Sequence, residues 1–101
     1  MKNAKKELLK ILKESTIKCA LIAKEYSFTH KSRIILKLNY TKNDYEEFLK
    51  KLDFHYNSGF GTQELYGTVW LNDNTWLTRG EYDGSEWWEH SVLPNIPSEC
   101  I

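Results

Sequence analysis

The residues of this chain best suited to chemistry are carboxylates and an imidazole near its carboxyl end. Glu86, Glu89 and His90 form an E-x-x-E-H motif, which on one helical turn could place two carboxylates and a ring nitrogen around a metal ion. Glu81 and Asp83, together with Glu86, could instead hold a divalent cation for nuclease-type chemistry. Both patterns have simpler interpretations, since Asp83 begins a turn-forming Asp-Gly pair and the E-x-x-E-H motif borders two tryptophans. We therefore predict no metal site, no cofactor and no enzymatic activity.

The histidines and cysteines do not add a catalytic pattern. The three histidines are scattered, and none has a serine, cysteine or aspartate at a spacing typical of a nucleophilic site: His30, His55 and His90. Cys19 lies in an apolar run and Cys100 near the end of the sequence, which is neither a disulfide framework nor a metal-ligand spacing. We expect two free thiols, with Cys19 buried.

Residues 64–88 contain all four tryptophans and read as a β-hairpin that runs into a tight turn. The run Asn72-Asp73-Asn74 separates two apolar segments, and these side chains favour a chain reversal because they tolerate a left-handed backbone and bond their own main chain. A two-residue loop within this run predicts Leu71 opposite Trp76 and Val69 opposite Thr78. In this register Trp76 points into the core.

The other side of this hairpin carries more aromatic side chains than an ordinary solvent face. Four tryptophans are too many to bury fully in one small domain, and exposed aromatics are frequent binding hot spots, so at least one of Trp70, Trp87 and Trp88 is expected at the surface. Nearby carboxylates favour a basic partner. The residues predicted to contact a partner are Tyr66, Trp70, Arg79, Glu81, Asp83, Glu86, Trp87 and Trp88.

The net charge of zero conceals an asymmetry between the two halves of the chain. Residues 1–52 hold 13 Lys and Arg against 6 Asp and Glu, a net charge of +7, whereas residues 53–101 hold 1 against 8, a net charge of −7. If the halves interleave in one sheet, these charges largely compensate. The basic half also supports an alternative, a small nucleic-acid-binding domain that uses a first hairpin: Lys18, Lys24, Lys31, Arg33 and Lys37.

The hydrophobic periodicity predicts helices over residues 2–14 and 41–53, the second opened by a capping box of Thr41 and Asp44. Alternating patterns predict strands over residues 17–26 and 33–40, followed by the two strands of the tryptophan hairpin. The order is α-β-β-α-β-β. It indicates an α+β fold with a four-stranded, mainly antiparallel sheet and both helices on one face. A barrel-like curl of the sheet is the competing architecture.

The 101 residues are enough for a single domain, with a tail from about residue 90 that two prolines keep irregular. Residues 85–89 are expected to form one helical turn. The longest apolar run is far shorter than a membrane span, and no signal-peptide pattern follows the lysine-rich start, so we expect a cytoplasmic protein without membrane contact. An open sheet face can also support a homodimer.

The C-terminal run GFGTQELYGTVWLNDNTWLTRGEYDGSEWWEH, followed by two prolines, resembles the tail of small uncharacterised proteins of bacteriophages and other mobile elements. This resemblance covers about the last 45 residues. It implies a non-enzymatic inhibitor of a host nucleic-acid-handling or defence protein, in the manner of anti-CRISPR or anti-restriction proteins. The resemblance thus implies that the partner is a host protein, bound through the acidic aromatic hairpin.

Overall fold

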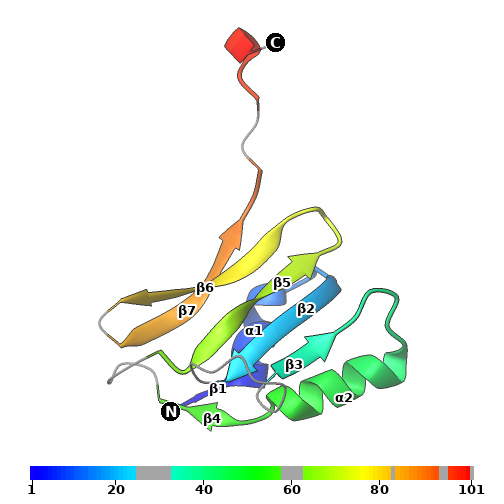
Figure 1. The fold of residues 1–101 in the computed structure, drawn as a ribbon, viewed down its shortest axis with the longest axis vertical. Coiled ribbons are helices and arrows are strands. Elements are labelled where there is room, and N and C mark those ends of the chain that lie inside the picture. Colours follow the sequence, from blue (N-terminus) through cyan, green and yellow to red (C-terminus); the bar gives the residue numbers. More distant parts are fainter. Residues whose placement is uncertain (25–32, 58–62, 83, 94–95, 101) are drawn as a thin grey trace.

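The computed structural model describes residues 1–24, 33–57, 63–82, 84–93 and 96–100 of the chain. Lys31, Asp83 and the connection between the first two long strands lie outside these ranges. The elements, in chain order, are β1 (Lys2–Asn3), α1 (Ala4–Leu12), β2 (Ile17–Lys24), β3 (Arg33–Leu36), α2 (Lys42–Leu52), β4 (His55–Tyr56), β5 (Leu65–Leu71), β6 (Trp76–Tyr82), β7 (Ser85–Ser91) and a 3-10 turn (Ser98–Cys100) (Figure 1).

The main sheet has five antiparallel strands in the order β3-β2-β5-β6-β7, and β1 pairs with β4 in a separate two-stranded ribbon. The α+β class and the antiparallel sheet are confirmed, but the predicted four-stranded order is wrong. The additional long strand is β7, where a helical turn was expected. Its residues alternate between the two faces, with Glu86 and Trp88 buried and Trp87 and Glu89 exposed, which is the period of a strand.

Both helices begin at a side-chain cap. Thr41 and Asp44 form the predicted capping box, with each side chain accepting a hydrogen bond from the backbone N–H of the other. The first helix starts later than predicted, because Asn3 occupies the cap position and accepts a bond from the backbone N–H of Lys6. Each cap provides an acceptor for a backbone N–H group in the first turn, where the N–H groups have no partner within the helix.

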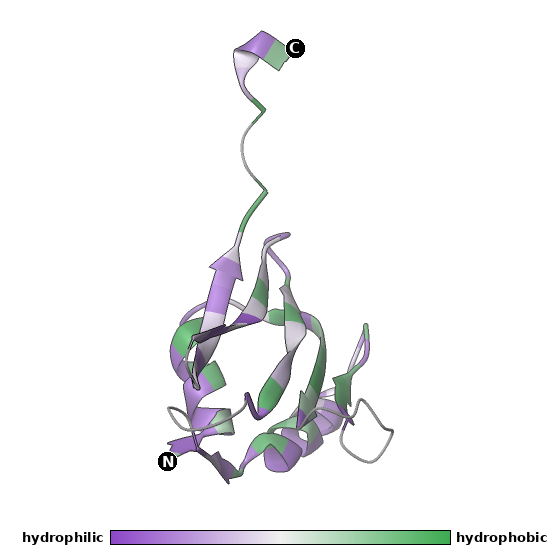
Figure 2. Cartoon of the chain, turned by 60° about the vertical axis from the view of Figure 1, so that its left-hand side comes forward, coloured by the Kyte–Doolittle hydropathy of each residue, from purple (hydrophilic) through white to green (hydrophobic). Residues whose placement is uncertain are grey.

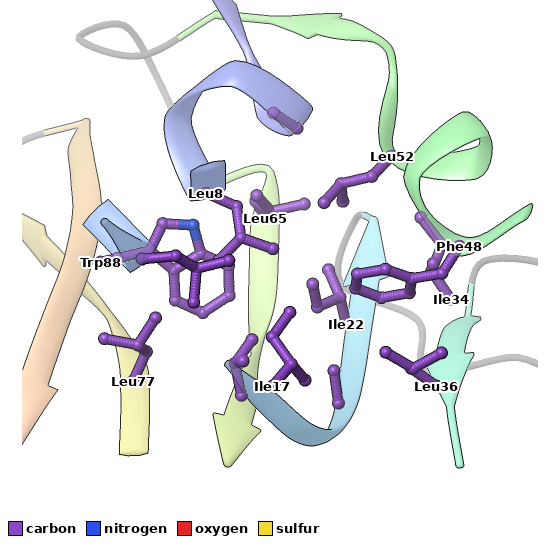
Figure 3. Packing of buried hydrophobic residues seen from close by; sticks show 14 of the residues in the cluster. Leu8, Ile17, Ile22, Ile34, Leu36, Phe48, Leu52, Leu65, Leu77 and Trp88 are labelled. Atoms are coloured by element: carbon purple, nitrogen blue, oxygen red, sulfur yellow. The ribbon is translucent and has the colours of Figure 1, made fainter. Parts of the chain in front are cut away.

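The core lies on one side of the sheet, where both helices contribute their apolar stripes. Ala4, Leu8 and Leu12 of α1 and Phe48 and Leu52 of α2 join the inward residues of the strands in one buried cluster (Figure 3). The prediction that both helices share one face is therefore correct. The sheet curls around this core (Figure 2), although in the described residues its edge strands β3 and β7 do not pair with each other. The result is a curled, open sheet rather than a closed barrel.

The tryptophan hairpin has a register one residue away from the predicted one. Trp70 pairs with Trp76 and Val69 pairs with Leu77, because the reversal between β5 and β6 uses three residues rather than two. Asn74 has a positive φ of 66°, a left-handed conformation that asparagine tolerates at the last position of such a loop. This shift turns Trp76 outward, and it turns Leu77 and Arg79 inward.

Candidate functional site

The outer side of the sheet is a broad aromatic surface. Trp70 on β5 is 41% exposed and Trp87 on β7 is 36% exposed, and between them Trp76 on β6 is half-buried. The strand register places Trp76 directly beside Trp70. Both helices pack on the inner side of the sheet (Figure 1), and Trp87, on the edge strand β7, also lines a hollow with Lys10 and Ile11 of α1. We refer to Tyr66, Trp70, Trp76 and Trp87 as the aromatic face.

A carboxylate is fixed within the aromatic face. Trp87 donates a hydrogen bond from Nε1 to Glu89 Oε1 at 3.1 Å, and both side chains lie close over the backbone of Gly80 on the neighbouring strand. An added Cβ at Gly80 would lie 2.6 Å from both Trp87 Nε1 and Glu89 Oε1, so only glycine leaves room for this arrangement. The aromatic face therefore presents an oriented negative charge next to an exposed indole.

The structure divides the predicted contact residues into an exposed and a buried group. Tyr66, Trp70, Glu81 and Trp87 are exposed or half-buried on the hairpin strands and on β7. The Arg79 side chain is only 2% exposed and Glu86 is 0% exposed, and Trp88 is 5% exposed within the core. Asp83 lies outside the described residues. The buried residues Arg79, Glu86 and Trp88 contact one another and neighbouring elements, as described next.

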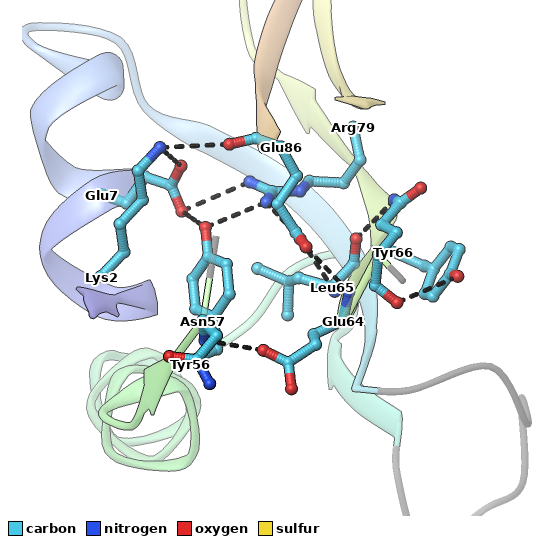
Figure 4. A network of polar contacts seen from close by, with 10 residues as sticks. Lys2, Glu7, Tyr56, Asn57, Glu64, Leu65, Tyr66, Arg79 and Glu86 are labelled. Atoms are coloured by element: carbon cyan, nitrogen blue, oxygen red, sulfur yellow. Dashed lines mark hydrogen bonds and ion pairs between the residues drawn. The ribbon is translucent and has the colours of Figure 1, made fainter. Parts of the chain in front are cut away.

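Glu86 is the centre of a buried polar network (Figure 4). Its carboxylate accepts hydrogen bonds from the backbone N–H groups of Glu64 and Leu65, at 2.8 and 3.0 Å, and from Arg79 Nη2 at 2.7 Å. The Arg79 guanidinium also lies 4.9 Å from the Trp88 ring centroid, a cation–π distance. A buried carboxylate is tolerated because cation and backbone donors satisfy it.

The network continues from Arg79 to the first helix. Arg79 Nη1 lies 3.3 Å from Glu7 Oε1, and Arg79 Nη2 donates to the Tyr56 hydroxyl at 3.0 Å. The Tyr56 hydroxyl in turn donates to Glu7. Burial and this bond to Glu7 raise the pKa of Tyr56 well above its ordinary value, because both disfavour the phenolate. These contacts connect α1 and β4 to β6 and β7, so the network has a structural role.

The E-x-x-E-H motif does not converge on a single point. Because β7 is a strand, Glu86 points into the core while Glu89 points to the outer face. His90 is exposed, and its Nε2 lies 2.7 Å from the hydroxyl of Thr75. In the described ranges, no three of the His, Cys, Asp and Glu side chains are grouped to hold a metal ion.

The charged halves of the chain lie side by side instead of interleaving. Strands β2 and β3 and both helices come from the basic half, whereas β5, β6 and β7, which are consecutive in the sheet, come from the acidic half. The alternative that strands of the two halves interleave in the sheet, so that their charges compensate, is therefore wrong. Trp70 and Trp76 lie on strands of the acidic half, whereas Trp87 also lines a hollow with Lys10 and Lys13 of the basic half.

The basic residues of the first hairpin are not gathered in one patch. Arg33 pairs with Ala23, so its side chain lies on the opposite face of the sheet from that of Lys24, which lies 4.7 Å from the Phe54 ring centroid. Lys18 is six residues from Lys24 along β2, a separation of about 20 Å. Lys37 follows the end of β3, and both it and Lys18 are exposed. Lys31 lies outside the described residues.

The sequence did not indicate the outward position of Trp76, whereas the alternation of residues 33–36 did indicate that of Ile35, which is 49% exposed on the outer side of β3. Asn74 could have indicated the position of Trp76. Asparagine tolerates a left-handed backbone, and a left-handed residue at the third position of the loop gives the observed register. Cys19, expected to be buried, is half-buried opposite Trp70. Neither Cys19 nor Cys100 forms a disulfide.

Comparison of the chain with protein-family models, curated proteins and solved structures gives no match. Within the described residues, no helix is both long and apolar enough to cross a membrane.

Proposed function

We propose that this chain is a non-enzymatic protein-binding module that docks through its aromatic face onto a basic site of a partner protein. The observation that carries the proposal is that three of the four indoles lie on the outer side of the sheet, and only Trp88 is sealed in the core. Large aromatic side chains at a surface supply much of the binding energy of protein interfaces. An uncovered group of them on a small domain is typical of an interaction site.

The charge around the aromatic face favours a basic partner. Glu89 is held beside Trp87, and the strands that carry the aromatic face belong to the half of the chain with a net charge of −7. Complementary charge speeds association and orients the two surfaces. A site that normally binds nucleic acid has the required positive potential.

These features, together with the resemblance to phage proteins, support a finer proposal. The chain acts as a phage-type inhibitor, comparable to anti-CRISPR proteins, that covers the nucleic-acid site of a host defence or nucleic-acid-handling protein. It functions in the host cytoplasm, where such machinery operates. A homodimer through the same face is the competing use of this surface, and it predicts a doubled mass in solution.

The test compares two double variants that remove similar exposed apolar area. Trp70→Ala/Trp87→Ala alters the aromatic face, and Leu9→Ala/Leu38→Ala alters residues that are 39% and 58% exposed elsewhere. Proteins retained from a bacterial lysate by the natural chain are identified, and the affinity of each purified candidate is then measured. We expect the aromatic pair to lower affinity at least tenfold, and the control pair to leave it within about twofold.

Two further measurements separate contact from folding and identify the partner's surface. Circular dichroism and urea unfolding establish that each variant is folded, and Trp70→Ala alone serves if the substitution at Trp87, which packs on Gly80, destabilises the sheet. Nucleic acid bound by the partner should compete with the chain. Equal affinity of the aromatic variant and the natural chain would exclude the aromatic face as the contact surface.

A further inference from the structure

A lysine-lined groove follows the first helix. Its volume is about 440 Å³, and it is lined by Met1, Lys2, Asn3, Lys6, Glu7, Lys10 and His55. A second hollow of about 320 Å³ adjoins it, since the two share Glu7 and Lys10, and this hollow continues between α1 and β7. Together they form a path along the whole length of α1.

The cations of this groove form a row. Lys6 and Lys10 are four residues apart in α1, which places them on one helix face, about 6 Å apart along the axis at a rise of about 1.5 Å per residue. Lys13 follows the end of the helix with a positive φ of 52°, and it lines the second hollow with Lys10. Lys2 precedes the helix, in β1. In the described part of the chain, Lys6, Lys10 and Lys13 have no ion-pair partner.

Among the described residues, the nearby carboxylates leave Lys6, Lys10 and Lys13 unpaired, whereas Lys2 forms an ion pair with Glu7 at 3.6 Å and donates to the backbone carbonyl of Glu86. Glu7 is directed to the buried network, where it contacts Arg79 and Tyr56 as well as Lys2 (Figure 4). Asp53 accepts a hydrogen bond from Asn3 at one end of the groove. Unpaired like charges four residues apart weaken their own helix, and a bound anion relieves their repulsion.

The second hollow differs from the first in its chemistry. It is lined by Ile11, Trp87 and Trp88 with Lys10 and Lys13 at its border, so an apolar floor lies directly beside two ammonium groups. Trp88 is 5% exposed, and among the described residues its Nε1 has no hydrogen-bond partner. A flat, uncharged ring attached to a phosphate matches such a surface.

We propose that the groove along α1 binds a single-stranded nucleic acid, with successive phosphates on Lys6, Lys10 and Lys13 and one base in the hollow at Ile11. A single strand is favoured over a duplex because a duplex keeps its bases stacked and offers only phosphates to the row. This site is separate from the first-hairpin lysines, and Trp87 is the one residue that it shares with the aromatic face.

The test is fluorescence anisotropy with a labelled oligothymidylate of about 15 nucleotides at two salt concentrations. Three phosphate contacts to a single strand predict that raising salt from about 50 to about 200 mM lowers affinity roughly 18-fold. Lys6→Glu/Lys10→Glu leaves one contact and predicts a fall of only about 2.6-fold over the same range. At low salt this variant should bind at least tenfold more weakly than the natural chain.

Matched controls locate the site. Lys18→Glu/Lys37→Glu makes the same change of charge at exposed positions outside the groove, and it should lower affinity far less than the helix pair. Trp70→Ala should bind the oligonucleotide normally, which separates this site from the aromatic face. Absence of binding at low salt, equal losses in both lysine pairs, or equal affinity for single strand and duplex would each overturn the assignment.

Discussion

Replacement of Glu86 by alanine is the most direct test of the buried network. The change removes the acceptor for two backbone N–H groups and for Arg79, all within 3.0 Å, and Glu86 is 0% exposed, so water cannot substitute without opening the sheet. Removing one partner of a buried ion pair costs about 3 to 5 kcal/mol. A domain of this size is stable by about 5 to 15 kcal/mol in total. The variant should therefore lose a large fraction of its stability.

Urea unfolding followed by tryptophan emission provides the assay, because Trp88 lies next to Arg79 in the folded state. A loss of 3 kcal/mol corresponds to a fall in melting temperature of at least about 12 °C in a domain of about 100 residues. Glu47→Ala is the control: Glu47 forms an exposed ion pair with Lys50, 3.7 Å apart, and its removal should cost less than about 0.5 kcal/mol.

A double-mutant cycle separates the ion pair from general loss of packing. Arg79→Met and Glu86→Ala should be non-additive by at least about 1 kcal/mol, because each single change leaves a buried partner uncompensated. If Glu86→Ala costs less than about 1 kcal/mol, or if the two losses simply add, the carboxylate is not the buried acceptor that the structure describes.

Three further predictions concern the core, one glycine and high pH. Trp88→Ala should cost about 3 to 5 kcal/mol of unfolding free energy and Trp70→Ala less than about 1, as urea denaturation can measure, because only Trp88 is in the core. Gly67 has a φ of +145°, and a Cβ there would lie 2.4 Å from the carbonyl oxygen of Leu21, so Gly67→Ala should cost at least about 1 to 3 kcal/mol by the same measurement. Because the pKa of Tyr56 is raised on folding, its contribution to stability is complete below the ordinary value of 10.0 and decreases as pH rises above it. Unfolding free energy should thus fall above pH 10, less steeply in Tyr56→Phe, whereas an identical slope in both proteins would contradict this assignment.

Local signals in the sequence were sufficient for the helices. The pair Thr41 and Asp44 marks the start of α2 by a bond that forms within four residues, so no tertiary information was needed. The common placement of both helices also followed from their single apolar stripes, since each stripe has to be buried. The helix cap and the apolar stripes both depend on residues that are close together in the sequence, so they can be predicted from the sequence.

The strand register and β7 depended on interactions that the sequence does not state. One additional loop residue, Asn72, exchanged the two faces of β6, because side chains alternate with a period of two. The segment that begins at Ser85 is a strand since pairing with β6 buries Trp88, and this long-range gain outweighs local propensity. Both errors also explain why the burial of Arg79 and Glu86 was not predicted. Charged residues are expected at the surface until their partners are known.

Because side chains of β7 alternate between the core and the outer face, the same strand contributes to the stability of the fold and to the aromatic face. Glu86 and Trp88 anchor the strand from inside, and the next side chains, Trp87 and Glu89, are thereby held on the outer face. A change at Glu86 should reduce partner binding only in proportion to the unfolded fraction, whereas a change at Trp70 should reduce the affinity of fully folded protein. Measuring affinity together with the folded fraction therefore distinguishes residues that build the surface from those that contact the partner, although both groups occur in the same short segment.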